Sequence, residues 1–168
     1  MSDQKLRHAA ASRVAEKGRA QKFDVNVIAA RHEDEGVDFI CLWEDANGDW
    51  HSGPITFPRN SGEHDVEFKL DDRTGLNLAF EASGSNAIWF NADCCPTSAS
   101  GDDKGQIHDR HVETGNKKLK LKNRNSSACN LHYALRFTGN SWTSPGGKQH
   151  NAPYVYDPEF RNEGGTNR

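Results

Sequence analysis

The stretch NLHYALRF, residues 130–137, alternates apolar and polar side chains with a period of two. Its apolar members are Leu131, Tyr133, Leu135 and Phe137. The intervening residues are Asn130, His132, Ala134 and Arg136. A period of two is that of a β-strand with one face in a core and the other in solvent. The stretch therefore predicts a half-buried strand.

Similar alternating runs recur upstream of this stretch, separated by turn residues. Residues 23–29, 66–70 and 76–80 alternate, whereas residues 38–44 are apolar on both faces, which indicates a central strand. Short strands separated by turns at spacings of about 8–12 residues are typical of a sandwich or barrel. We therefore expect an all-β fold, an antiparallel β-sandwich of about eight strands.

Two segments indicate particular hairpins. Asn47-Gly48 lies between apolar runs and predicts a tight turn, because a type I′ turn needs positive φ at both central positions. We expect residues 55–57 to close that hairpin. Residues 117–122 alternate lysine with leucine, and we expect this strand to pair with residues 130–137. Lysines on an exposed strand discourage edge-to-edge aggregation. No aromatic residue alternates with them to stack bases, so a nucleic-acid partner is not expected.

The charge of the chain is uneven. Residues 1–22 carry six Lys or Arg and two acids, whereas the chain as a whole has a net charge of −3. Residues 4–20 could form a short α-helix with a thin apolar stripe at Leu6, Ala10 and Val14. We therefore divide the chain into a basic N-terminal helix or tail (1–22), a β-sandwich domain (23–163) and a tail (164–168).

The cysteines and the hydropathy pattern bear on the compartment. The four cysteines are Cys41, Cys94, Cys95 and Cys129. No stretch is long and apolar enough to span a bilayer, and charges interrupt the N-terminus too early for a secretory signal. We therefore expect reduced thiols and a cytoplasmic location.

Exposed aromatic and polar side chains supply the candidate binding residues. Trp142 lies in a loop of Ser, Thr, Pro and Gly that offers little to bury it, and exposed aromatic rings stack on sugars or peptides. Loops 92–106 and 139–152 are long, and loops commonly carry function. The predicted ligand-binding residues are Trp142, Tyr154, Trp50, His132 and Arg136.

A metal or thiol centre is the alternative. Cys94 and Cys95 with His108 and His111 could supply thiolate and imidazole ligands for zinc or copper, or a thiolate nucleophile with a histidine base. The spacing argues against it, because Cys-x-x-Cys is missing and a strand would point His108 and His111 to opposite faces. We expect no metal, cofactor or catalytic residue, with an enzyme centred on these four residues as the rival.

The end of the chain resembles a known group of proteins. Residues 133–137 are followed by Tyr156-Asp157-Pro158-Glu159-Phe160-Arg161-Asn162-Glu163-Gly164, which contains an Asp-Pro-x-x-x-Asn motif. This segment is similar to the ends of small, mostly uncharacterised bacterial proteins with an immunoglobulin- or cupredoxin-like sandwich. The resemblance implies a β-sandwich and a bacterial origin, and it implies no particular activity.

These observations favour a non-enzymatic binding or assembly module of a bacterial cytosolic protein. We expect a protein partner or self-association. A glycan-binding module that uses the Trp142 loop is a further alternative, and a membrane span is not expected.

Overall fold

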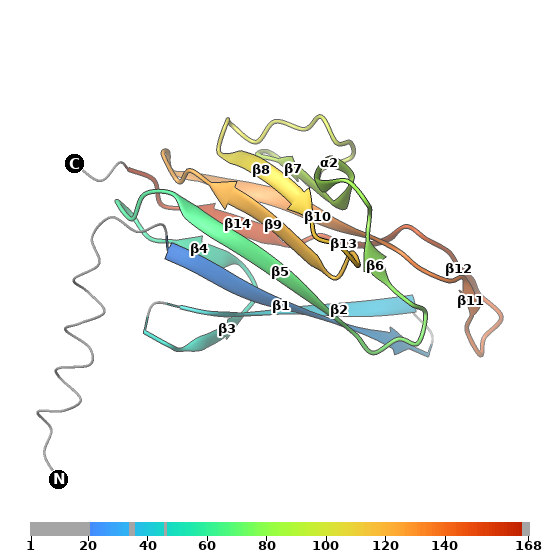
Figure 1. Ribbon diagram of the computed structural model, residues 1–168. Helices are drawn as coiled ribbons and strands as arrows, with labels where there is room; N and C mark the ends of the chain where they lie inside the picture. Colours follow the sequence, from blue (N-terminus) through green and yellow to red (C-terminus); the bar gives the residue numbers. More distant parts are fainter. Residues whose placement is uncertain (1–20, 34–35, 46, 166–168) are drawn as a thin grey trace, which may run out of the picture.

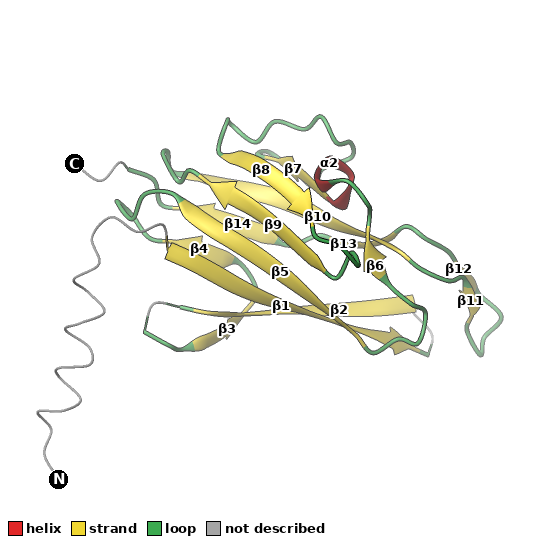
Figure 2. Cartoon of the chain, viewed as in Figure 1, coloured by secondary structure: helices red, strands yellow, loops and turns green. Residues whose placement is uncertain are grey.

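The computed structural model describes residues 21–33, 36–45 and 47–165, and nearly all of its regular structure is β (Figure 1, Figure 2). The described part contains one helix, the single turn α2 (Gly84–Ala87), whose N-terminus is capped by the Ser83 side chain. The predicted all-β class is thus confirmed. The predicted N-terminal helix falls on residues outside the described range, and β1 begins at Gln21.

The first sheet, here called sheet A, has six strands in the order β3-β2-β1-β5-β9-β8. Its strands are β1 (Gln21–His32), β2 (Gly36–Glu44), β3 (Trp50–Ser52), β5 (His64–Asp72), β8 (Ile107–Val112) and β9 (Lys118–Asn123). Neighbouring strands are antiparallel except for β1 and β5, which run parallel. Sheet A lies toward the viewer in Figure 1.

The second sheet, sheet B, is built around the long central strand β10. Its strands are β4 (Ile55–Phe57), β6 (Ala79–Phe80), β7 (Ile88–Asn91), β10 (Cys129–Thr138), β13 (Tyr154–Tyr156) and β14 (Glu159–Asn162). β10 pairs with β6 and β7 along one edge and with β13 and β14 along the other, and β14 pairs in parallel with β4. A separate hairpin of β11 (Trp142–Thr143) and β12 (Gln149–His150) projects at one end (Figure 1).

The sheets are mixed, so the prediction of a purely antiparallel sandwich was wrong. After β3 the chain crosses to sheet B, forms β4, and returns to sheet A as β5 alongside β1 in the same direction. The alternation of apolar residues reports which face each side chain takes. It carries no information about strand direction, because that depends on the path between strands.

The same crossing corrects two predicted pairings. The Asn47-Gly48 turn does join two antiparallel strands, but they are β2 and β3, while residues 55–57 pair with β14 in the other sheet. Residues 118–123 pair with β5 and β8 in sheet A, whereas residues 129–138 belong to sheet B. The two strands lie in different sheets because the segment between them crosses from one sheet to the other.

Aromatic side chains from both sheets meet in the core. The inward residues of β10, Leu131, Tyr133, Leu135 and Phe137, are all buried, as the alternation predicts. Phe160 of β14 lies at the centre, with its ring 4.5 Å from that of Tyr133 and 5.1 Å from that of Phe57. It also stacks at 6.3 Å on Phe68 of sheet A. Phe160 therefore links the two sheets directly.

A buried polar network holds the C-terminal strand. The side-chain amides of Asn123 and Asn162 bond reciprocally, at 2.7 and 3.0 Å. Asn125 donates to the backbone oxygen of Pro58 and accepts from the backbone N–H of Gly164. These amide and backbone groups are buried, so each needs a hydrogen-bond partner within the protein. The network therefore ties β14, β9 and the loop after β4 together.

Candidate functional site

The predicted binding residues are divided among three surfaces. Trp142 and Tyr154 belong to the hairpin end, and Trp50 lies on the edge strand β3. His132 and Arg136 lie on the outer face of sheet B. Trp50 pairs with Glu44 at the far end of β2 from the hairpin, so the structure does not bring the five residues into one site.

Trp142 is held by its neighbours at the end of β1. Its ring stacks on that of His150, its cross-strand partner, at 4.8 Å and 21° between planes. The guanidinium carbon of Arg31 lies 5.4 Å from the centre of the same indole. Gly36 approaches His150 so closely that a Cβ there would stand 3.0 Å from Nδ1. The hairpin therefore packs against the β1–β2 end of sheet A.

Tyr154 anchors the hairpin through hydrogen bonds to its backbone. It is buried, and its hydroxyl donates to the backbone oxygen of Asn140 at 2.7 Å, with the backbone oxygen of His150 at 3.4 Å. Burial raises the pKa of its hydroxyl. Tyr154 therefore fixes the start and end of loop 139–152 and presents little surface to a ligand.

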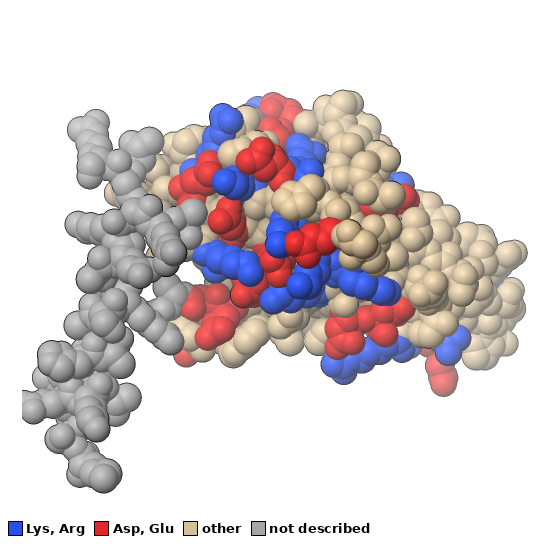
Figure 3. Space-filling view, in the orientation of Figure 1, with Lys and Arg blue, Asp and Glu red and all other residues tan. Residues whose placement is uncertain are grey.

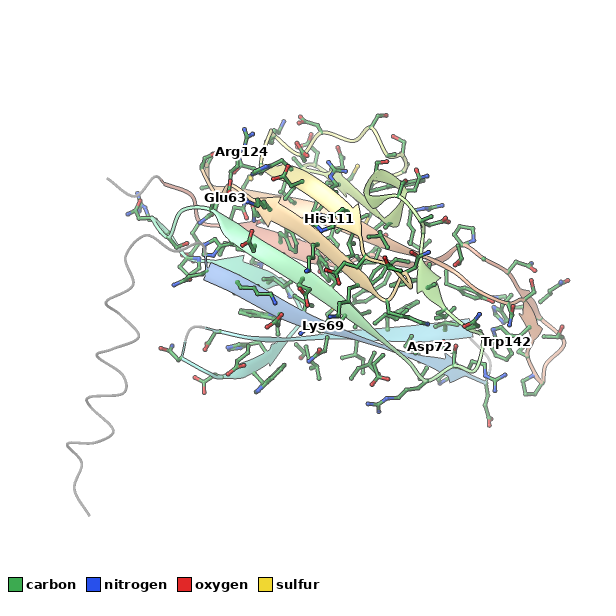
Figure 4. The ribbon with its side chains drawn as sticks, viewed as in Figure 1. Glu63, Lys69, Asp72, His111, Arg124 and Trp142 are labelled. Atoms are coloured by element: carbon green, nitrogen blue, oxygen red, sulfur yellow. The ribbon has the colours of Figure 1, made fainter. Side chains whose placement is uncertain are left out.

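A cavity of about 560 Å³ opens beside Trp142. Its wall includes Ala30, Arg31, Glu33, Arg73, Trp142 and Thr143. Figure 4 shows Trp142 at this end of the molecule, near the chain turn that follows Asp72. We call this cavity the hairpin cleft. Its rim comes from three places far apart in the sequence.

Arg73 is positioned in the hairpin cleft by its neighbours. Its guanidinium contacts one carboxylate oxygen of Asp71, from Nε at 2.9 Å and from a terminal nitrogen at 2.7 Å. Its backbone N–H donates to the oxygen of Ala29. Arg31 and Arg73 are absent from the residues predicted from the sequence, because nothing in their local sequence indicates that β1 and the β5–β6 turn lie beside the hairpin.

Asp72 stiffens the turn that carries Arg73. Its carboxylate accepts from the backbone N–H of Thr74 at 2.9 Å, the Thr74 hydroxyl at 2.5 Å and the backbone N–H of Leu78 at 2.8 Å. Partial burial opposes its ionisation, but these donors prevail and hold the pKa of Asp72 below the ordinary value. The turn is therefore a rigid part of the cleft wall.

The outer face of sheet B carries a second cluster. The guanidinium of Arg136 lies 3.8 Å from the ring centre of Trp89, which pairs with Ala134, two residues along β10. Nδ1 of His132 lies 3.9 Å from Glu159. Partial burial raises the pKa of Asp157, although Arg136 opposes this shift. Since Arg136 and His132 already contact neighbours on the sheet, they make a self-contained polar face.

The proposed metal or thiol residues do not assemble. Cys94 and Cys95 are exposed in loop 92–106, and the amide of Asn91 donates to the sulfur of Cys94 at 3.2 Å. Nε2 of His108 instead faces Glu63 at 2.7 Å. Within residues 21–33, 36–45 and 47–165, no group of three or more His, Cys, Asp or Glu side chains could hold a metal ion.

The lysines of β9 belong to an ionic lattice on the outer face of sheet A. Lys22, Lys69 and Lys120 lie 3.3, 3.5 and 3.4 Å from the carboxylate of Glu67, which is only 6% exposed. Lys122 lies near Glu63 and Asp65. Figure 3 shows basic and acidic side chains interleaved over this face. The strand 118–123 is therefore largely neutralised in place, which argues against a phosphate-binding row.

Comparisons with known proteins add no functional assignment. The sequence matches no model of a known protein family, and it has no significant match among curated proteins. Among the described residues, no helix has the length and apolar character required to cross a membrane.

Proposed function

We propose that the chain is a non-enzymatic binding module that recognises a segment of a protein partner at the hairpin cleft. The observation that carries the proposal is the meeting of Trp142, Arg31 and Arg73 around one cavity of about 560 Å³. Trp and Arg are the residues most enriched among those that dominate protein–protein binding energy. Loops at one end of a pair of packed sheets are also a common place for recognition.

The geometry favours a protein partner over a glycan. A sugar ring needs an open aromatic face, whereas Trp142 is stacked on His150 and approached by the guanidinium of Arg31. The indole of Trp142 is partly buried, and the two guanidinium groups beside it offer donors for backbone carbonyls and carboxylates. These features suit an extended peptide that lies across the cleft.

Features away from the hairpin cleft bear on the compartment and the origin of the chain. All four cysteines are free, which supports a reducing compartment such as the cytoplasm. The resemblance of the last strands to bacterial immunoglobulin- or cupredoxin-like proteins supports a bacterial origin and a sandwich of that kind. The described residues contain no group of three or more His, Cys, Asp or Glu that could hold a metal ion, so nothing in them favours the metal-dependent form of the alternative centred on Cys94, Cys95, His108 and His111.

The test is selection of peptide ligands followed by measurements on variants. Peptides that bind the immobilised full chain are recovered from a random display library, and their dissociation constants are measured by calorimetry. We expect Arg73→Gln and Trp142→Ala to weaken binding about thirtyfold or more, because hot-spot truncations cost about 2 kcal/mol or above. Arg73→Gln keeps the backbone bond of the turn, so it separates recognition from folding.

Trp50→Ala is the matched control, since it removes an exposed tryptophan at the other end of β2. It should leave the affinity unchanged. Peptides that bind Arg73→Gln as tightly as the wild-type chain, or that lose affinity only in Trp50→Ala, would show that the hairpin cleft is not the site. Binding to a glycan array that depends on Trp142 would favour the glycan alternative.

A further inference from the structure

Four apolar side chains form a patch on the outer face of sheet A, away from the hairpin cleft. We call this group, Ile28, Ile40, Leu42 and Trp50, the β2 patch. Ile28 lies directly opposite Ile40 in the β1–β2 pair, and Trp50 lies opposite Glu44, two residues along the same face from Leu42. Ile40 is 53% exposed and Trp50 56% exposed, the two most exposed large apolar residues among those described. Contiguous exposed apolar residues mark an interaction surface more often than scattered ones do.

The rim of the β2 patch is acidic. Asp24, Asp38 and Glu44 share its face by the alternation of β1 and β2. Neither Asp38 nor Glu44 forms an ion pair with another described residue, and Asp24 is paired with Lys22 and Lys69 at the edge of the ionic lattice. Within the described part, no Lys or Arg lies on the outer face of β2, of β3, or of β1 from residue 24 to 30. A complementary partner therefore combines apolar and basic side chains.

The chain itself contains a segment of this chemistry. Residues 1–20, which lie outside the described range, contain the basic residues Lys5, Arg7, Arg13, Lys17 and Arg19 against two acids. The same segment contains Leu6, Val14 and several alanines. It joins β1 at Gln21, on the strand that forms one side of the β2 patch.

The segment is long enough to reach the patch. Ile28 lies seven residues along β1 from Gln21, which is about 23 Å at the rise of a strand. Twenty residues span about 30 Å even as a helix, and more when extended. A segment tethered to its own binding surface experiences an effective concentration on the order of millimolar, so a weak intrinsic affinity is sufficient.

We propose that residues 1–20 bind the β2 patch of their own chain, with basic side chains toward Asp38 and Glu44 and apolar side chains on Ile40 and Trp50. The patch is then covered in the free protein. This interaction is separate from the hairpin cleft, so either proposal stands if the other fails.

The test is limited trypsin digestion of the full chain, because trypsin cleaves after each of the five basic residues of the segment. Mass spectrometry follows the rate of cleavage after Arg13 and Lys17. We expect the segment to be cleaved about tenfold faster in Ile40→Asp than in the wild-type chain, because the variant loses the tethered contact that protects the segment. Val155→Asp is the matched control, since Val155 is 39% exposed on the other sheet and should leave the rate unchanged.

A second variant keeps the test decisive if Ile40→Asp lowers stability. Trp50→Ser changes a side chain on the short edge strand β3 and should also speed cleavage. One molar salt should speed cleavage of the wild-type chain, because it screens the acidic rim. Equal cleavage rates in all variants overturn the proposal. Protection that rises with protein concentration, together with dimers in light scattering, also overturns it in favour of binding between two copies.

Discussion

Replacing Glu67 by glutamine tests the ionic lattice on sheet A. The carboxylate is 6% exposed and lies 3.3 to 3.5 Å from three ammonium groups, those of Lys22, Lys69 and Lys120. Burial opposes ionisation of Glu67, but the contacts with Lys22 and Lys120 hold its pKa below the ordinary value. The favourable contacts therefore exceed the cost of burial, and a neutral side chain should be less stable.

The magnitude follows from the exposure of the three lysines, which are 37% to 51% exposed. Each pair is worth about 1 kcal/mol in a water-like dielectric, and three give about 3 kcal/mol. The variant regains part of this free energy, because burying a neutral amide costs less than burying a carboxylate. Each lysine also keeps a second carboxylate, that of Asp24 or Glu113. We therefore expect Glu67→Gln to lower the free energy of unfolding by about 1–2 kcal/mol at pH 7.

The assay is urea unfolding followed by circular dichroism at low salt and at 1 M salt, with Glu113→Gln as a control of lower expected effect. Because the folded pKa of Glu67 is lowered, its contribution is present above the unfolded pKa of about 4.3 and is lost as pH falls through the folded pKa. The wild-type chain and Glu67→Gln should therefore converge in acid and in high salt. Equal unfolding midpoints at pH 7 and low salt would refute this account of the lattice.

Three further predictions concern the interior. Phe160→Ala should lower the free energy of unfolding by about 3–5 kcal/mol and Phe160→Leu by less, and a loss in urea unfolding below about 1.5 kcal/mol would show that the ring does not join the sheets. Burial raises the pKa of the Cys41 thiol to about 12, so a thiol reagent should label residues 94–95 in the native chain and leave Cys41 unlabelled until urea is added. Asn162→Ala should cost about 1–3 kcal/mol, because a buried amide on β9 loses its partner, and unchanged thermal unfolding would contradict this.

The burial of individual strands could be predicted well from the sequence. The inward residues of 130–137 and of 23–29 are buried as their alternation indicates, because burial of an alternating strand is a local property. Pairing was predicted poorly. Residues 55–57 and 117–122 were assigned to hairpins with their neighbours along the chain, and the structure places them beside other strands. Strand partners depend on crossings between sheets, which leave no periodic signal.

The candidate site was predicted only in part. Trp142 was identified from the loop composition around it, and it does line the hairpin cleft. Arg31 and Arg73 were missed, since they lie 111 and 69 residues before Trp142 in the sequence. Tyr154 was selected for its aromatic ring, but its hydroxyl bonds show that it supports the loop. Trp50 was predicted as a binding residue, but its neighbours in the β2 patch were not.

The sequence by itself determined which side of each strand is apolar, where the chain turns, and the uneven distribution of charge between the basic N-terminal segment and the rest. These are local properties that each residue and its near neighbours specify. Only the tertiary structure decided that β5 lies parallel to β1, that Glu67 stands among three lysines, and that Arg31 and Arg73 meet Trp142. Such meetings depend on where the chain crosses between the sheets, because two packed sheets bring distant segments together at their ends.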